Sequence, residues 1–167
     1  MRFFLIFLFV FSFLKADILK DFFEKKYNNL CTYQNIQKYK DENILSLIGF
    51  SCVKLDKIYL LPFITNKLKK TDIGRKNSIY FSTIYLQKKL LMAYFFDNYS
   101  LDGFSFPKSD YILSVIFDKI KHHKYEKIGN IYIIDNGDII YNIFKKEDKI
   151  VIDEIKGGKV IKKHWFR

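Results

Sequence analysis

The spacing of apolar residues divides this chain into a helical part and a strand part. Apolar positions recur at helical spacing up to about residue 126 and with a period of two after it. The longest helical run, residues 77–97, is apolar or aromatic on almost every side, and its polar positions Ser78, Ser82 and Lys89 form one narrow stripe. Because a helix with so little polar surface has to be covered by other elements, we expect it at the centre of the fold.

About five shorter helices are predicted around this central helix. Asp41 and Ser109 are favourable N-cap residues, and Gly49 either lowers helix stability or marks a close contact between helices. Residues 71–76 and 97–108 are expected to be loops. The shorter helices are predicted over residues 17–30, 31–40, 41–55, 57–70 and 109–122.

Four short runs rich in β-branched and aromatic residues predict an antiparallel β-meander after the helices. Asn136-Gly137 and Gly157-Gly158 are the expected hairpin turns, and residues 145–148 are a polar loop between the hairpins. The predicted strands are residues 131–135, 139–144, 150–155 and 160–165.

These turns set the pairing register, and the register decides which side chains face the helices. Asp153 is predicted to lie opposite Lys162 on the outer face. The inner face is predicted to carry Tyr132, Ile134, Ile139, Tyr141, Ile143, Ile150, Ile152, Ile161 and Trp165. The fold class is therefore α+β, with helices over residues 17–126 and a four-stranded antiparallel meander over residues 127–167, in a single domain spanning 17–167.

The first sixteen residues have the layout of a secretory signal peptide. Arg2 gives a positive start, residues 3–14 are an apolar run interrupted only by Ser12, and Ala16 is a small residue at the expected cut. Twelve residues are too few to span a bilayer, which takes about twenty. We expect a periplasmic or secreted protein; the alternative is an inner-membrane protein anchored by an uncleaved N-terminal segment.

Cys31 and Cys52 are the only cysteines. An even number of cysteines in an exported chain favours a disulfide. A metal pair or a redox pair would call for closer spacing. We therefore predict a structural bridge between Cys31 and Cys52 and no metal site.

The chain carries 29 Lys and Arg against 18 Asp and Glu, a formal net charge of +11. Such a charge suits an anionic envelope polymer or a lipid surface, although a preference for A- and T-rich codons would also produce a chain rich in Lys, Ile, Phe, Tyr and Asn. Nucleic-acid motifs are absent from the sequence, and export argues against that partner. The candidate anionic-partner patch consists of Lys145, Lys146, Lys156, Lys159, Lys162, Lys163 and Arg167.

Sequence signatures of catalysis and of cofactor binding are absent, so no catalytic residue and no cofactor is predicted. His122 and His123 are expected at the polar end of a helix, and His164 at an outward or edge position of the last strand, where a pairing with Asp153 is conceivable. A loop over residues 97–110 holds three acids that could serve glycan chemistry as a carboxylate pair, but turns and a helix cap also explain them. These acids are Asp97, Asp102 and Asp110.

The central helix is not expected to span a membrane, because Gln87, Lys88 and Lys89 interrupt it. The leading functional hypothesis is an exported, non-enzymatic accessory or scaffold component of a cell-envelope assembly, which binds another envelope protein. One alternative is a cell-wall glycan-acting enzyme or glycan binder that uses the 97–110 loop. The other is a peripheral membrane-surface protein that uses the basic rim of the sheet.

Overall fold

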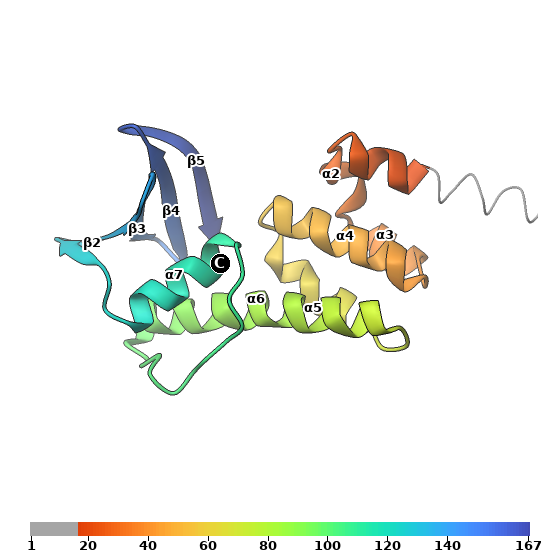
Figure 1. The fold of residues 1–167 in the computed structure, drawn as a ribbon, viewed down its shortest axis with the longest axis horizontal. Coiled ribbons are helices and arrows are strands. Elements are labelled where there is room, and N and C mark those ends of the chain that lie inside the picture. Colours follow the sequence, from red (N-terminus) through yellow and green to blue (C-terminus); the bar gives the residue numbers. More distant parts are fainter. Residues whose placement is uncertain (1–16) are drawn as a thin grey trace, which may run out of the picture. The chain divides into compact units, whose positions relative to one another are not determined.

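The computed structural model describes residues 17–167, which fall into two compact units, one ending at Ser82 and the other beginning at Thr83 (Figure 1). The division lies inside helix α6 (Asp72–Asp97), so each unit contains part of that helix. The predicted signal peptide, residues 1–16, lies outside the described residues. The second unit combines the later part of α6 with one further helix and the sheet.

Short helices make up the first unit. The helix predicted over residues 17–30 is interrupted, because Lys25 adopts a left-handed conformation with φ of 59°. Asp41 is confirmed as an N-cap, since its carboxylate accepts hydrogen bonds from the backbone N–H groups of Asn43 and Ile44. The elements before α6 are a helical segment at residues 17–23, α2 (Tyr27–Leu30), α3 (Tyr33–Lys38), α4 (Glu42–Lys54), the 3-10 helix η1 (Ile58–Leu60) and α5 (Leu61–Thr65).

The predicted disulfide is present: Cys31 and Cys52 are bonded, with Cα atoms 5.0 Å apart. It joins the end of α2 to the last turns of α4. Gly49 marks a close helix contact, since a Cβ atom at this position would overlap the ring of Phe81 on α6. The Cys31–Cys52 disulfide and the close helix contact at Gly49 therefore both contribute to the core of this unit.

Helix α6 begins at Asp72, five residues before the predicted start, so the loop predicted over residues 71–76 is wrong. The hydroxyl of Thr71 accepts a hydrogen bond from the backbone N–H of Gly74 at 2.9 Å, which is the N-cap arrangement. Gly74, which suggested a loop, lies inside the helix. A side chain does not fit at this position, because a Cβ atom there would overlap the carboxylate of Glu42.

The polar stripe predicted on α6 is only partly right. Ser82 and Lys89 are exposed, but Ile79 and Leu86 are also exposed, at 62% and 42%. Gln87 is almost fully buried even though it was assigned to the polar interruption of the helix. No helix within residues 17–167 is long and apolar enough to cross a membrane.

The second unit has a five-stranded antiparallel sheet in the order β1-β2-β3-β4-β5, where four strands were predicted. The additional strand, β1, is three exposed residues long, too short for a period of two to appear. The turn between β2 and β3 is Gly137-Asp138, one residue later than predicted, and Lys145 and Lys146 belong to β3 rather than to a loop. The elements after α6 are α7 (Ile112–Lys121), β1 (Glu126–Ile128), β2 (Ile131–Asn136), β3 (Ile139–Lys146), β4 (Lys149–Lys156) and β5 (Lys159–Phe166).

The predicted inner face is right for β2, β3 and β4 but wrong for most of β5. Ile155 pairs with Val160 while Glu154 pairs with Lys162, so Ile161 is an extra residue at a β-bulge. In the register without a bulge, Lys163 would share the buried face with Ile161 and Trp165.

The bulge reverses the faces of the residues after Ile161. His164 and Phe166 are buried, at 3% and 2% exposure, whereas Trp165 is 58% exposed. The predicted pair of Asp153 with Lys162 is replaced by Asp153 with Lys163, whose Nζ lies 3.1 Å from the carboxylate.

Candidate functional site

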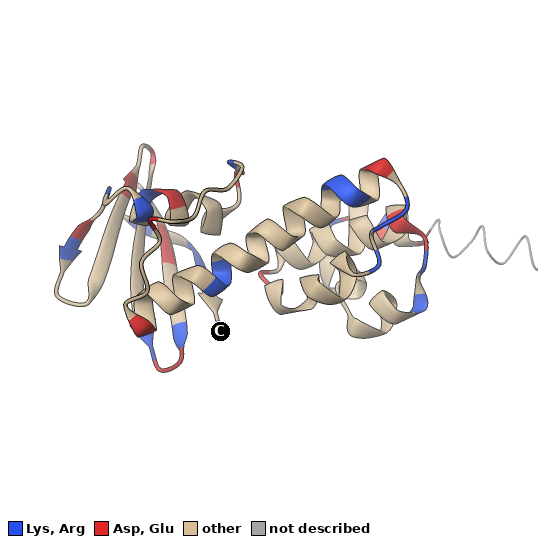
Figure 2. Cartoon of the chain, turned by 90° about the horizontal axis from the view of Figure 1, so that it is seen from below, with Lys and Arg blue, Asp and Glu red and all other residues tan. Residues whose placement is uncertain are grey.

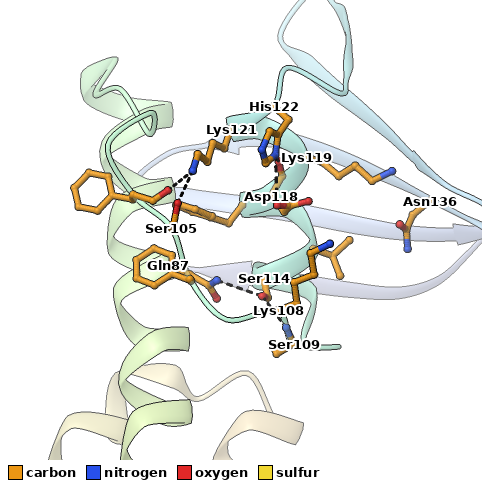
Figure 3. A pocket seen from close by; sticks show the side chains of 14 residues that line it. Gln87, Ser105, Lys108, Ser109, Ser114, Asp118, Lys119, Lys121, His122 and Asn136 are labelled. Carbon is orange, nitrogen blue, oxygen red and sulfur yellow. Dashed lines mark hydrogen bonds and ion pairs between the residues drawn. The ribbon is translucent and has the colours of Figure 1, made fainter.

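A pocket of about 310 Å³ lies in the second unit, between α6, α7 and the loop that joins them (Figure 3). The joining loop contributes Phe104, Ser105, Phe106, Lys108 and Ser109. Helix α7 begins three residues beyond Ser109, because Tyr111 is its N-cap and Ile112 its first residue. The predicted cap at Ser109 is therefore wrong; its hydroxyl instead accepts a hydrogen bond from the Tyr111 N–H at 3.4 Å.

Gln87 extends from α6 to Ser114 of α7 at one wall of the pocket (Figure 3). Its Nε2 donates to the Ser114 hydroxyl at 3.2 Å, and the backbone N–H of Ser109 donates to the same hydroxyl at 3.3 Å. Oε1 of Gln87 is buried and has no hydrogen-bond partner within residues 17–167. A buried amide oxygen without a partner costs about 1–3 kcal/mol. Unpaired groups of this kind need an explanation.

Three lysines line the pocket. Lys121 donates to the Phe104 carbonyl oxygen at 2.5 Å and to the Ser105 hydroxyl at 2.9 Å, so it fixes the joining loop on α7. Lys119 donates to the Asp135 carbonyl oxygen at 2.8 Å. Lys108 is exposed and makes no hydrogen bond or ion pair with the described residues. Within residues 17–167, none of the three ammonium groups is paired with a carboxylate.

Asp118 is the only acid of the pocket lining. Its carboxylate lies 3.4 Å from Nδ1 of His122, and that nitrogen is also 2.8 Å from the Asp118 carbonyl oxygen. His122 is the C-cap of α7, and His123 follows it with φ of 53°, so both end the helix as predicted. The pocket is therefore polar and carries an excess of positive charge.

The three acids of the 97–110 loop do not line the pocket, although part of that loop does. Asp97 ends α6, and Asp102 accepts a hydrogen bond from the Ser100 hydroxyl at 2.9 Å. Asp110 is exposed beside Ser109. The loop brings serines and a lysine to the pocket and leaves its carboxylates outside.

The structure places the seven basic residues of the candidate patch in separate parts of the sheet. Lys145, Lys146 and Arg167 lie toward the β3/β4 turn, where Arg167 pairs with Asp148. Lys156 and Lys159 face each other at the opposite end, beside the β4/β5 turn. Lys162 and Lys163 are neighbours in β5 and alternate between the two faces. Figure 2 shows blue and red segments next to each other at the strand ends.

An apolar row crosses the outer face of the sheet from one edge to the other. The row contains one residue from each strand, and each residue lies directly opposite its neighbour on the next strand. The two end residues, Ile128 and Trp165, are 64% and 58% exposed. The next row toward the other end of the sheet is mainly polar and contains Asn142, Asp153 and Lys163. The apolar row consists of Ile128, Ile131, Phe144, Val151 and Trp165.

His164 faces inward, which corrects the outward or edge position predicted for it. Its Nε2 lies 3.3 Å from the Glu154 carboxylate, not near Asp153. Burial raises the pKa of the neighbouring Tyr141, and the Glu154 charge raises it further. The pair of His164 and Glu154 therefore fills a polar position of the sheet's buried face.

Sequence analysis did not find Gln87 and Ser114 as a site. A glutamine inside an apolar helix is a signal of such a site, but from the sequence it indicates only that the helix does not span a membrane. Within residues 17–167, no group of three or more His, Cys, Asp or Glu side chains is placed to hold a metal ion. No protein-family model, no curated protein and no solved structure matches this chain.

Proposed function

We propose that this protein is exported to the periplasm and binds another cell-envelope protein, as a non-enzymatic accessory or scaffold component. The apolar row on the outer face of the sheet is the observation that supports this proposal best. Exposed apolar side chains that gather in one patch typically mark a surface for interaction. In this row Ile128, Ile131 and Trp165 are exposed, whereas Phe144 is half-buried and Val151 is buried. Tryptophan is also among the residues that contribute most to binding energy in protein interfaces.

The row ends at β5, which pairs only with β4 among the described strands. An edge strand has backbone N–H and C=O groups that a partner strand is able to pair with. A partner that covers the row and continues along β5 would combine side-chain burial around Trp165 with backbone hydrogen bonds. The exposed Lys159 of β5 suits a partner with an acidic residue at that edge, and Lys163, which pairs with Asp153, adds positive charge to the same strand.

The export part of the proposal rests on residues 1–16 and on the disulfide. A bridge between Cys31 and Cys52 is compatible with an oxidising compartment such as the periplasm. Fractionation of cells expressing the full chain would test it. Material from the periplasm should lack residues 1–16 and should contain no free thiol.

Trp165 is the only tryptophan of the chain, so intrinsic fluorescence reports on this surface directly. The protein would be used to capture partners from envelope extract, and each candidate would then be purified and titrated against it. Binding at the apolar row should shield Trp165 from quenching by acrylamide. Trp165→Ala should weaken capture by about tenfold or more, the effect typical of an aromatic interface residue.

Tyr59→Ala is the matched control, because Tyr59 is an aromatic residue of the first unit with the same 58% exposure. It should leave capture unchanged. A stoichiometric partner that binds Trp165→Ala as tightly as the wild type would rule out the row as the interface. A protein that stays monomeric and captures nothing would refute the scaffold role.

A second candidate function is a cell-wall glycan binder or enzyme that uses the 97–110 loop. The observation in its favour is that residues 104–106, 108 and 109 of this loop line the pocket. An enzyme of this class needs two carboxyl groups about 5–10 Å apart on either side of the substrate, and the lining contributes Asp118 alone. The binding version of this function therefore has more support than the catalytic one.

A further inference from the structure

The pocket beside α7 has the size and the walls of a small-molecule site. Its volume of about 310 Å³ lies at the lower end of the range for ligand pockets, about 300–1,000 Å³. Phe106 packs edge-on against Phe117 at 5.1 Å and stacks beside Phe104, so one side of the pocket is aromatic. A ligand of monosaccharide size would have a flat apolar surface to lie against.

The charges of the lining favour an anion. Lys108, Lys119 and Lys121 contribute three positive charges, and Asp118, which is paired with His122, contributes one negative charge. Lys119 and Lys121 donate to neutral carbonyl and hydroxyl oxygens, so no carboxylate cancels their charge. Lys108 is free to rotate toward a ligand, because it has no partner among the described residues.

The same wall also offers neutral hydrogen-bonding groups. Ser114 brings its hydroxyl to the amide of Gln87, and the backbone N–H of Ser109 donates to the same hydroxyl. The side chain of Ser109 also lines the pocket. Ser114 occupies one polar atom of that buried amide, and the other has no partner within residues 17–167. A ligand hydroxyl is both a donor and an acceptor, so it would suit this combination of serines and an amide.

We infer that this pocket binds a small hydroxylated anion, a sugar-sized molecule with several hydroxyl groups and one carboxylate or phosphate. The anionic group lies near Lys108, and the hydroxyl groups face Ser114 and Gln87. The aromatic side formed by Phe104, Phe106 and Phe117 packs against the carbon face of the ligand. This inference deepens the second candidate function, because the same loop lines the pocket, and it is independent of the apolar row.

Calorimetric titration of the full chain with D-glucuronate, glucose 6-phosphate and neutral glucose would test the inference. Saturable binding of at least one of the two anions, and much weaker binding of glucose, is the expected result. Binding of glucuronate alone would assign the anion as a carboxylate, and binding of glucose 6-phosphate alone would assign it as a phosphate. Raised salt should weaken the binding, since the attraction is partly between charges.

Lys108→Gln should reduce the affinity for the anion by about tenfold, the loss expected for a charge-assisted hydrogen bond. Lys40→Gln is the matched control: it removes the same charge from an exposed lysine of the first unit and should change nothing. Ser105→Ala provides a second, conservative change in the lining. Because both pocket variants alter exposed side chains, they should fold as the wild type does.

Two outcomes would overturn the inference. In the first, neither anion binds. In the second, Lys108→Gln binds the anion as tightly as Lys40→Gln does. The neutral trisaccharide of N-acetylglucosamine separates this inference from the glycan-binding candidate. If the trisaccharide binds while both anions fail, the glycan-binding candidate stands and only the anionic ligand is excluded. If the anions bind and the trisaccharide does not, the anionic ligand is supported and glycan binding at this pocket is excluded.

Discussion

Glu42 of α4 and Thr71, which comes just before α6, are joined by two hydrogen bonds. The Glu42 carboxylate accepts from the backbone N–H of Thr71 at 2.7 Å and from its hydroxyl at 2.5 Å. It also accepts from the backbone N–H groups of Lys69 and Lys70, both at 2.6 Å. A single carboxylate therefore orders the chain that leads into the longest helix of the protein.

The first prediction concerns pH. The hydrogen bonds from the Lys70 backbone and from Thr71 lower the pKa of Glu42 from 4.5 to about 2. Because the folded-state pKa is depressed, the stabilisation is complete above about 4.5 and is lost as the pH falls toward 2. Glu42→Gln should therefore unfold at a lower temperature than the wild type at neutral pH, and the difference should shrink in this acid range.

Thermal unfolding followed by circular dichroism at a series of pH values would measure this difference. Asp17→Asn, an exposed acid that is also in the first unit, is a control for the loss of one acidic charge. A difference between Glu42→Gln and the wild type that stays constant from neutral pH down to 2 would contradict the role assigned to Glu42.

The second prediction concerns Gly49. A side chain here would enter the ring of Phe81, so Gly49→Ala should cost about 1–3 kcal/mol through overpacking. Gly103→Ala is the matched control, because no heavy atom lies within 4 Å of a Cβ built there. Urea unfolding of both variants would give the two free energies. A Gly49→Ala variant as stable as Gly103→Ala would mean that α4 and α6 do not approach closely at this position.

The third prediction tests the bulge in β5. Phe166→Ala should cost about 3–5 kcal/mol, because it empties a buried position, whereas Trp165→Ala should cost about 1 kcal/mol or less. The register without a bulge places Trp165 inside and so predicts the opposite order. Comparison of the two unfolding free energies decides between the registers.

The fourth prediction concerns the disulfide. Cys31 and Cys52 are 21 positions apart, and a loop of that length contributes about 3 kcal/mol in the chain-entropy account. A Cys31→Ala/Cys52→Ala double variant should lose stability of that order. Intact mass before and after reduction should differ by two hydrogen atoms. Equal masses would mean that the native protein has free thiols.

Local signals in the sequence predicted a large part of the fold. Asp41 was identifiable as a cap because capping depends on its own side chain and on N–H groups two and three residues further along. The strands of the meander were identifiable because half-buried strands alternate polar and apolar residues. The start of α6 was missed because Gly74 has a loop-like residue type, while its actual constraint comes from Glu42, far away in the sequence.

Two features could not be predicted from the sequence: which side chains of β5 face the core, and the pocket beside α7. One extra residue, Ile161, exchanges the faces of all the residues after it, and both faces of that strand contain apolar side chains, so the pattern alone fits either register. The lining of the pocket comes from α6, α7, their joining loop and Asn136 at the end of β2. No spacing along the chain brings these residues together.

The course of α6 through both units affects how the protein can be divided or recombined. A cut between Ser82 and Thr83 would leave the first unit with only the first eleven residues of the helix, Asp72 through Ser82. Isolated helices shorter than about 12–15 residues are marginal in water, so the first unit would depend on tertiary packing for its part of α6. Neither unit is therefore a module that could be exchanged, fused or duplicated at this boundary without interrupting a helix. Gene duplication or domain shuffling would be expected to transmit the two units together.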